Sequence, residues 1–233
     1  MEPCLQQHEI TSSGLQWLET VFQNNNIPID AFLKDAETVL TSAHPKKKTL
    51  FLEGASNTGK TLVQELLLSD RGSVGYAELT GRERFELTPI VNANIAVVSE
   101  FRATIRNVDR AKRLFGGEKM PIEQKNKGTA IVHGKPVIVT AQTGWSGWLG
   151  SSDLRAMTNR IFHYKFMREL KEAPVILCPC YWKELRKKWL PQAELNVQEK
   201  TLTMKTKWMS PNEVVVVDRT EEWEDRPAQM ADL

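Results

Sequence analysis

The chain has 233 residues, a formal net charge of +2, and 41% hydrophobic and 26% charged residues, which is ordinary for a globular protein. No stretch approaches the roughly 20 uninterrupted apolar residues of a membrane span, and the N-terminal residues lack the basic and apolar regions of a secretory signal. We therefore expect an intracellular protein with no membrane partner. Three cysteines support neither a disulfide framework nor a zinc site, so we expect reduced thiols.

The charges are unevenly distributed along the chain. Residues 218–233 contain six acids and two arginines, a net charge of −4, so the remaining residues carry +6. This asymmetry is a weak indication of an anionic partner for residues 1–217, and a solvated surface is the alternative. We expect residues 218–233 to form an acidic, disordered tail.

Two helices are expected before the first strand. Apolar residues recur at helical spacing between Ser12 and Phe22 and again between Asp30 and about Ser42. A basic linker, 44–48, follows the second helix. Residues 1–45 are therefore predicted to form a small helical lead-in that packs on the core or contacts another subunit.

From Thr49 the pattern changes to alternating strands and helices. The expected strands are 49–53, 75–79, 94–99, 136–142 and 161–166, and the expected helices are 60–69, 104–115 and 153–159. Such alternation predicts a mostly parallel sheet that helices cover on both faces. We expect this α/β core to extend over residues 46–170.

Residues 54–61 fit the phosphate-binding pattern G-x-x-x-x-G-K-[ST] at every fixed position, between a buried strand and a helix. We expect positive φ angles at Gly54 and Gly59, so that backbone N–H groups and the positive end of the helix dipole face a nucleotide. Lys60 would contact the β and γ phosphates, and Thr61 would bind Mg²⁺. A chance glycine-rich turn is the alternative. The expected nucleotide-binding residues are Gly54, Ala55, Ser56, Asn57, Thr58, Gly59, Lys60 and Thr61.

Phosphoryl transfer also needs a carboxylate near Mg²⁺ and water, a polar group near the γ-phosphate and often an arginine from another subunit. Glu100, at the end of a buried strand, is the candidate carboxylate and metal ligand; a solvated strand end is the alternative. Gln142, at the end of another buried strand, would orient the water or the γ-phosphate. Arg160 is a candidate arginine finger, with a surface ion pair as the alternative.

A hairpin is predicted between these motifs. Residues 120–124 and 129–132 have strand patterns, and the turn chemistry of 125–128 places Lys125 and Lys127 at its tip. Lysines two residues apart at a hairpin tip project together and contact nucleic-acid phosphates without reading sequence. A solvated turn is the alternative.

The region after residue 170 is expected to be a C-terminal extension, 171–217, that packs on the core. Residues 181–190 combine aromatic and basic residues at the spacing of an amphipathic helix. Its aromatic residues fit a core position better than a base-stacking platform. Val214 to Val217 are predicted to form an edge strand.

The ordered motifs resemble those of the superfamily 3 helicases of small DNA viruses, from about Asn26 to Phe166. Residues 116–127 look most like the parvovirus or densovirus non-structural replication protein, and parts of the lead-in are similar to the papillomavirus replication helicase. The matching segments are 54–61 for Walker A, 99–100 for Walker B, 115–127 for the third motif, 136–142 for sensor 1 and 159–162 for the finger.

This resemblance implies a P-loop NTPase of the AAA+ type that uses ATP and Mg²⁺ and assembles into a hexameric ring. ATP would be hydrolysed between subunits, where Arg160 reaches the nucleotide of the neighbour. Lys125 and Lys127 would grip single-stranded DNA or replication-origin DNA in the ring channel. A viral replication helicase of this kind would act in the host nucleus.

Two residues depart from the family pattern. The family usually has two adjacent acids at the end of the Walker B strand, but here the first is Ser99, so Glu100 would act alone. The sensor strand usually ends in Asn, but here it ends in Gln142. An alternative function is therefore a nucleotide-gated DNA-binding or assembly protein with impaired hydrolysis. A small-molecule kinase is a third hypothesis, although nothing in the sequence indicates an acceptor pocket.

A further departure concerns the upstream nicking nuclease of the parvovirus replication proteins. The 45 residues of lead-in are too few to contain it. We therefore expect a helicase module or a reduced relative.

Overall fold

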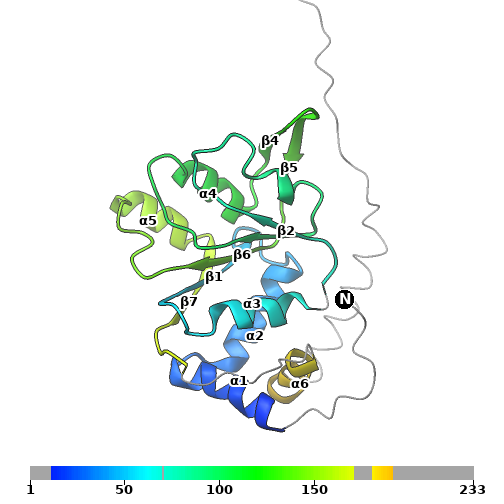
Figure 1. The fold of residues 1–233 in the computed structure, drawn as a ribbon, viewed down its shortest axis with the longest axis vertical. Coiled ribbons are helices and arrows are strands. Elements are labelled where there is room, and N and C mark those ends of the chain that lie inside the picture. The colour runs from blue at the N-terminus through cyan, green and yellow to red at the C-terminus, as the bar shows by residue number, and fades with distance from the viewer. Residues whose placement is uncertain (1–11, 70, 171–179, 191–233) are drawn as a thin grey trace, which may run out of the picture.

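The computed structural model describes residues 12–69, 71–170 and 180–190. Its centre is a five-stranded parallel sheet in the order β2-β3-β6-β1-β7 (Figure 1). The inner strands β1 (Thr49–Gly54), β3 (Ile95–Val98) and β6 (Val137–Ala141) are buried at every position. The edge strands are β2 (Val74–Ala77) and β7 (Ile161–Phe166). The expected parallel sheet is confirmed, and burial of both faces explains why its inner strands are almost wholly apolar.

Helices form a layer on each face of the sheet (Figure 1). One layer contains α1 (Ser12–Asn24), α2 (Ile29–Leu40), α3 (Lys60–Leu68) and α6 (Cys180–Trp189). The other contains α4 (Val108–Gly116) and α5 (Ser151–Thr158). Successive side chains of β1 point to opposite faces of the sheet, so this strand contributes to both apolar cores. Leu50 and Leu52 face the first layer, and Phe51 faces the second.

The amphipathic helix α6 packs on the helical lead-in. Trp182 and Leu185 are buried in the same apolar cluster as Phe32 of α2, which confirms that the aromatic residues of this helix belong to the core. Glu37 of α2 is buried and forms ion pairs with Arg71 and Arg186, because a buried carboxylate requires charged or hydrogen-bonding partners.

Cys180 at the start of α6 is disulfide-bonded. The expectation of reduced thiols is therefore wrong at this position. The expected edge strand Val214 to Val217 and the acidic tail 218–233 lie outside the described residues.

The helix expected over 104–115 begins later, at Val108. Asn107 is fully buried, and its side chain accepts a hydrogen bond from the Thr104 N–H and donates to the carbonyl oxygens of Leu79 and Arg102. These bonds hold residues 101–107 as a loop against the segment after β2. A buried asparagine that satisfies loop backbone groups competes with helix formation, which explains the delayed start.

A separate two-stranded hairpin is formed by β4 (Met120–Gln124) and β5 (Gly128–Val132). One face is buried against the core through Met120, Ile122, Ala130 and Val132, whereas the tip is exposed. Asn126 and Gly128 adopt positive φ angles of 61° and 73° at the turn, as tight hairpin turns require. The predicted hairpin is confirmed, with its second strand starting one residue early.

Within the described ranges, none of the helices is both long and apolar enough to span a lipid bilayer. The same residues contain no group of three or more His, Cys, Asp and Glu side chains arranged to bind a metal ion.

Candidate functional site

A cavity of about 550 Å³ lies at the carboxyl ends of the sheet strands. The phosphate-binding loop after β1, the segment after β3 and the end of β6 all contribute to its wall. Because parallel strands end at the same edge of a sheet, motifs far apart in the sequence meet there. The lining residues are Ser56, Asn57, Thr58, Gly59, Lys60, Thr61, Leu62, Gln64, Ser99, Glu100, Thr140, Ala141, Gln142 and Leu170.

The loop between β1 and α3 has the backbone geometry of an anion-binding turn. Gly59 has a φ of 87° and Asn57 a φ of 60°, but Gly54 does not have a positive φ. The prediction was therefore wrong for Gly54, where glycine is needed for a different reason. A Cβ atom at Gly54 would overlap with the carbonyl oxygen of Phe166 on the neighbouring strand β7.

Lys60 is the first residue of α3 and directly follows this loop. Its ammonium donates to the carbonyl oxygen of Gly54 at 2.8 Å, to that of Ala55, and to Thr58 Oγ1 at 3.3 Å. Burial lowers the pKa of Lys60, and the Glu100 carboxylate partly opposes this shift. Glu100 is therefore close enough to Lys60 to interact with it electrostatically. The first N–H groups of α3 also point towards the loop without acceptors inside the helix.

Glu100 lies just beyond the end of β3, in the left-handed conformation with a φ of 51°. Its backbone N–H donates to Thr140 Oγ1 of β6 at 3.2 Å, and the N–H of Phe101 donates to the Thr140 carbonyl at 2.8 Å. A non-glycine residue in this region is strained, and such strain gathers at functional sites. The Glu100 side chain is exposed on the cavity wall.

Gln142 follows the last residue of β6 and is exposed on the same wall. The structure thus brings the loop, Glu100 and Gln142 to one cavity, as the sequence predicted. Strand β6 lies between β1 and β3, so Gln142 is carried by the strand next to the loop and Glu100 by the strand beyond it. This order was not predictable from the positions of the motifs along the chain.

Arg160 is not brought to this cavity. It precedes β7 and therefore lies at the opposite, amino edge of the sheet. Its guanidinium forms an ion pair with Glu118 at 2.8 Å, donates to the Ala156 carbonyl at 2.8 Å and packs against Gly116. In the described structure, Arg160 has the ion pair that was the alternative to an arginine finger.

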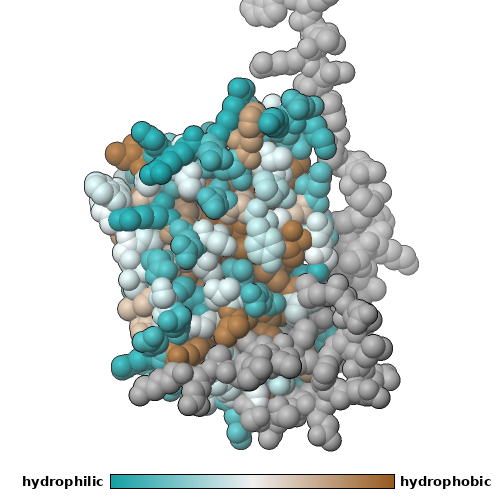
Figure 2. Space-filling view, viewed as in Figure 1, coloured by the Kyte–Doolittle hydropathy of each residue, from teal (hydrophilic) through white to brown (hydrophobic). Residues whose placement is uncertain are grey.

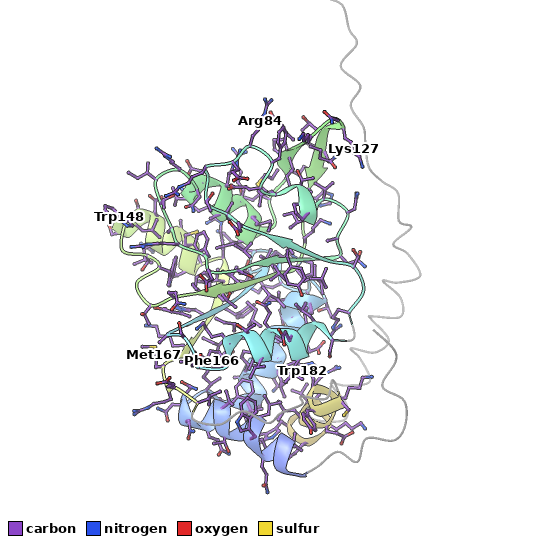
Figure 3. All side chains as sticks on the ribbon, in the orientation of Figure 1. Arg84, Lys127, Trp148, Phe166, Met167 and Trp182 are labelled. Carbon is purple, nitrogen blue, oxygen red and sulfur yellow. The ribbon has the colours of Figure 1, made fainter. Side chains whose placement is uncertain are left out.

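Lys125 and Lys127 are exposed at the hairpin tip, and neither forms an ion pair with the described residues. Figure 3 shows Lys127 at the free end of the hairpin. The surface over this end of the molecule is mainly hydrophilic (Figure 2). Close to the turn, Glu123 of β4 pairs with Arg84, and its carbonyl accepts from Thr88 Oγ1 at 3.4 Å. Thr88 begins the short helix η1 (Thr88–Ile90).

Two contributions to the cavity were not predicted from the sequence. Thr140 positions the Glu100 backbone, and a hydroxyl near the end of an otherwise apolar strand was the available signal. Leu170 lines the cavity and its N–H donates to the Asn57 carbonyl at 2.9 Å. Asn25, directly after α1, accepts hydrogen bonds from the N–H groups of Met167 and Arg168 in the same segment. These contacts have no local signal, because the loop and residues 167–170 are far apart in sequence.

Comparison with known proteins gives consistent matches. Residues 36–146 match the family described as "Parvovirus non-structural protein NS1". The initiator protein NS1 of Aedes densonucleosis virus is 27% identical over 165 residues, covering 69% of this chain and 19% of that protein. Protein Rep52 of adeno-associated virus 2 is 27% identical over 135 residues, covering 56% of this chain and 34% of Rep52. The chain thus spans a fifth to a third of the length of these relatives.

The solved structure of JCV helicase is similar in fold. It superimposes with a TM-score of 0.53 and 17% identity, covering 84% of this chain and 58% of that one. The P-loop, the mostly parallel sheet with helices on both faces and the basic hairpin confirm the AAA+-like α/β fold class. The motifs, the fold and these matches together show that the chain resembles the superfamily 3 helicase domain of small DNA viruses, in particular the parvovirus and densovirus non-structural proteins.

Proposed function

We propose that the chain is an ATP-dependent DNA helicase or translocase module for viral-type DNA replication. The observation that supports this most strongly is the single cavity that the phosphate loop, Glu100 and Gln142 line together. These are the groups that hydrolysis of a nucleoside triphosphate requires: a cradle for the phosphates, a carboxylate for the metal and water, and an amide near the γ-phosphate.

The cavity fits ATP with Mg²⁺ in chemistry. The ammonium of Lys60, the N–H groups at the start of α3 and the left-handed turn at Gly59 all favour a phosphate chain. Thr61 and Glu100 are oxygen donors on the cavity wall and would hold Mg²⁺, which prefers such ligands. Bound Mg²⁺ would neutralise charge on the phosphates. Glu100 would polarise the attacking water, and Gln142 would orient the water or the γ-phosphate.

The positions of Arg160 and the cavity favour hydrolysis between subunits. Arg160 lies at the opposite edge of the sheet from its own cavity, so it can reach only the nucleotide of another subunit. In a closed ring each subunit presents different faces to its two neighbours, which pairs one subunit's cavity with the next subunit's Arg160. We therefore propose a homo-oligomeric ring, hexameric by analogy with the family, in which Arg160 exchanges Glu118 for the neighbour's phosphates.

The hairpin supplies the proposed contact with DNA. Lys125 and Lys127 are exposed at its tip, whereas its strands are fixed to the core by the apolar packing of one face and by the contacts of Glu123 with Arg84 and Thr88. Lysine contacts with phosphate bind any sequence, as a translocating protein requires. Single-stranded DNA or replication-origin DNA is thus the proposed partner. The protein would act inside the infected cell, and the nucleus is the proposed compartment.

One observation favours a second candidate, a nucleotide-gated DNA-binding or assembly protein with impaired hydrolysis. Ser99 lines the cavity beside Glu100, where the family usually has another acid. With one carboxylate in place of two, the metal and the water would share Glu100, which lowers the rate of hydrolysis more than the affinity for nucleotide.

The two candidates are separated by the ATPase rate, measured with and without single-stranded DNA on protein of known mass in the presence of ATP and Mg²⁺. A helicase module should assemble, and DNA should raise its turnover. Glu100→Gln should lower kcat by about 100-fold or more with little change in nucleotide affinity, since electrostatic groups at the reacting atoms supply effects of this size.

Ser99→Asp is the matched variant at the neighbouring position. A large gain in its turnover over a slow unaltered protein would support the second candidate. Robust turnover of the unaltered protein would reject that candidate, and a Glu100→Gln variant with unchanged turnover would overturn the catalytic assignment.

A further inference from the structure

A buried carboxylate directly precedes the phosphate loop and has no part in the chemistry described above. Glu53 of β1 is only 8% exposed and lies on the strand face that carries Phe51. One oxygen of Glu53, Oε2, accepts the indole N–H of Trp145 at 3.3 Å and lies 2.7 Å from Nε2 of His163 on β7. Because an ionised carboxylate only accepts hydrogen bonds, His163 donates from Nε2. Burying a charged carboxylate is costly unless hydrogen bonds compensate for the lost water, and Trp145 and His163 provide these bonds to Glu53.

Trp145 connects this carboxylate to two functional loops. Its ring is 3% exposed and packs against Phe51, at 4.6 Å between centroids, and against Phe101, at 6.1 Å. Its carbonyl oxygen accepts the N–H of Ala103 at 2.9 Å. Trp145 therefore joins the loop after β6 to the loop after β3, on the side of the sheet covered by α4 and α5.

Both loops carry residues of the candidate site. Gln142 is three residues before Trp145, and Glu100 is three residues before Ala103. Glu53 itself is adjacent to Gly54, the first residue of the phosphate loop, and its Cα pairs with that of Ala141 in the sheet. Through its contact with Trp145, the buried Glu53 side chain thus links the phosphate loop to the segments that hold Glu100, the proposed water-activating group, and Gln142, the proposed γ-phosphate sensor.

We propose that Glu53 and Trp145 are positioning residues for nucleotide hydrolysis, which hold Glu100 and Gln142 in register with the phosphate loop. The hydrogen bond from Trp145 to Glu53 sets the distance between the loops, and the contact between Trp145 and Ala103 transmits it to Glu100. The inference rests on the ATP hydrolysis proposed above. It adds that recognition of the γ-phosphate depends on a buried contact outside the cavity.

Trp145→Phe tests this pair, because it removes the indole N–H and retains an aromatic ring. We expect kcat for ATP to fall about tenfold, the size expected for a lost hydrogen bond to a charged group. The preference for a non-hydrolysable ATP analogue, AMP-PNP, over ADP should fall about threefold, while the affinity for ADP stays within about twofold. Trp148→Phe is the matched control, since Trp148 lies in the same loop but is 68% exposed. It should change none of these quantities.

Substitutions of Glu53 supply the second arm. Glu53→Gln keeps an acceptor for the indole N–H and should retain more turnover than Glu53→Leu. Adding Trp145→Phe to Glu53→Leu should cause little further loss, because residues that act through one contact are not additive. Thermal unfolding of each variant shows whether it is folded.

Two results would overturn the inference. In the first, Trp145→Phe leaves both kcat and the preference for AMP-PNP unchanged. In the second, affinity for ADP falls as much as affinity for AMP-PNP, which indicates general damage to the phosphate loop. If the unaltered protein binds both nucleotides but hydrolyses no ATP, the proposed hydrolysis fails. The preference for AMP-PNP over ADP then decides the inference alone.

Discussion

The nucleotide cavity contains a buried cation, whereas the basic hairpin carries exposed cations. Lys60 is 8% exposed and its ammonium is satisfied by acceptors of its own loop, whereas Lys125 and Lys127 are exposed and form no ion pair with the described residues. The cavity is built at the carboxyl edge of a buried parallel sheet. The hairpin is a two-stranded element with one solvated face and a free tip.

This difference means that the cavity depends on precise geometry and the hairpin on the amount of charge. A buried cation acts only where the surrounding atoms place it, so the cavity depends on a fixed arrangement of several segments. An exposed lysine contributes a charge that water and salt screen, so the hairpin depends on how many charges it presents. Substitutions in the cavity should therefore act on the chemical step, and substitutions at the tip on the affinity for DNA and its salt dependence.

The largest effect is expected from removing either of the two cations that the proposed site between subunits combines, Lys60 of one subunit and Arg160 of the next. Lys60→Ala and Arg160→Ala should each reduce ATP turnover by about 100-fold or more, because each removes a cation from the reacting phosphates. Mixing the two variants should restore turnover, since random assembly places an intact Lys60 opposite an intact Arg160 at about a quarter of the interfaces. The ATPase rate of the mixture measures this complementation.

Two controls define that experiment. The double variant Lys60→Ala with Arg160→Ala, mixed with either single variant, should restore no turnover. Restoration there, or no restoration in the first mixture although rings assemble, would contradict an arginine that acts between subunits. Glu118→Gln should leave turnover in place, because it removes only the ion pair that Arg160 forms with a residue of its own subunit.

A smaller effect is expected at the hairpin tip. Replacing both Lys125 and Lys127 by alanine should weaken binding of single-stranded DNA about tenfold and make the slope of log K against log salt less negative by about 1.4. ATP turnover without DNA should be unchanged. A salt titration of binding to a fluorescent oligonucleotide measures both quantities.

The charge-matched control for the hairpin is Lys183→Ala with Lys187→Ala on α6, in the layer on the other face of the sheet. If this control weakened DNA binding as much as the tip variant, the effect would be one of net charge. The hairpin would then have no special role.

The smallest effect is expected from pH, at the buried contact behind the cavity. Burial lowers the pKa of His163, an effect that Glu53 opposes and Lys165 reinforces. Below pH 6.5, the ordinary histidine value, the unfolded chain therefore binds a proton that the folded protein resists. The unfolding free energy should fall as the pH drops through this range.

His163→Gln should remove that part of the pH dependence. Denaturant unfolding of both proteins at several pH values measures the difference. An identical slope in the two proteins, or a stability that increases on acidification because of His163, would show that the buried pair does not behave as described.

The sequence predicted the elements with strong local patterns. The octet at 54–61 fixed the turn between β1 and α3, the apolar runs fixed the strands, and the turn residues at 125–128 fixed the hairpin. Helix α4 differed because the pattern of residues 104–107 is helical, whereas Asn107 bonds to the distant Leu79 carbonyl. Gly54 differed because its requirement comes from the neighbouring strand.

By itself, the sequence determined the chemical groups of the candidate site. It also determined the parallel sheet, which brings the carboxyl ends of the strands to one edge, because periodicity and turn chemistry act over a few residues. Only the tertiary structure decided that β6 separates β1 from β3, that Leu170 borders the phosphate loop and that Arg160 lies at the far edge. It also decided that Glu53 meets Trp145 and His163. These are contacts between residues distant in sequence, which arise from packing the whole chain and leave no local signal.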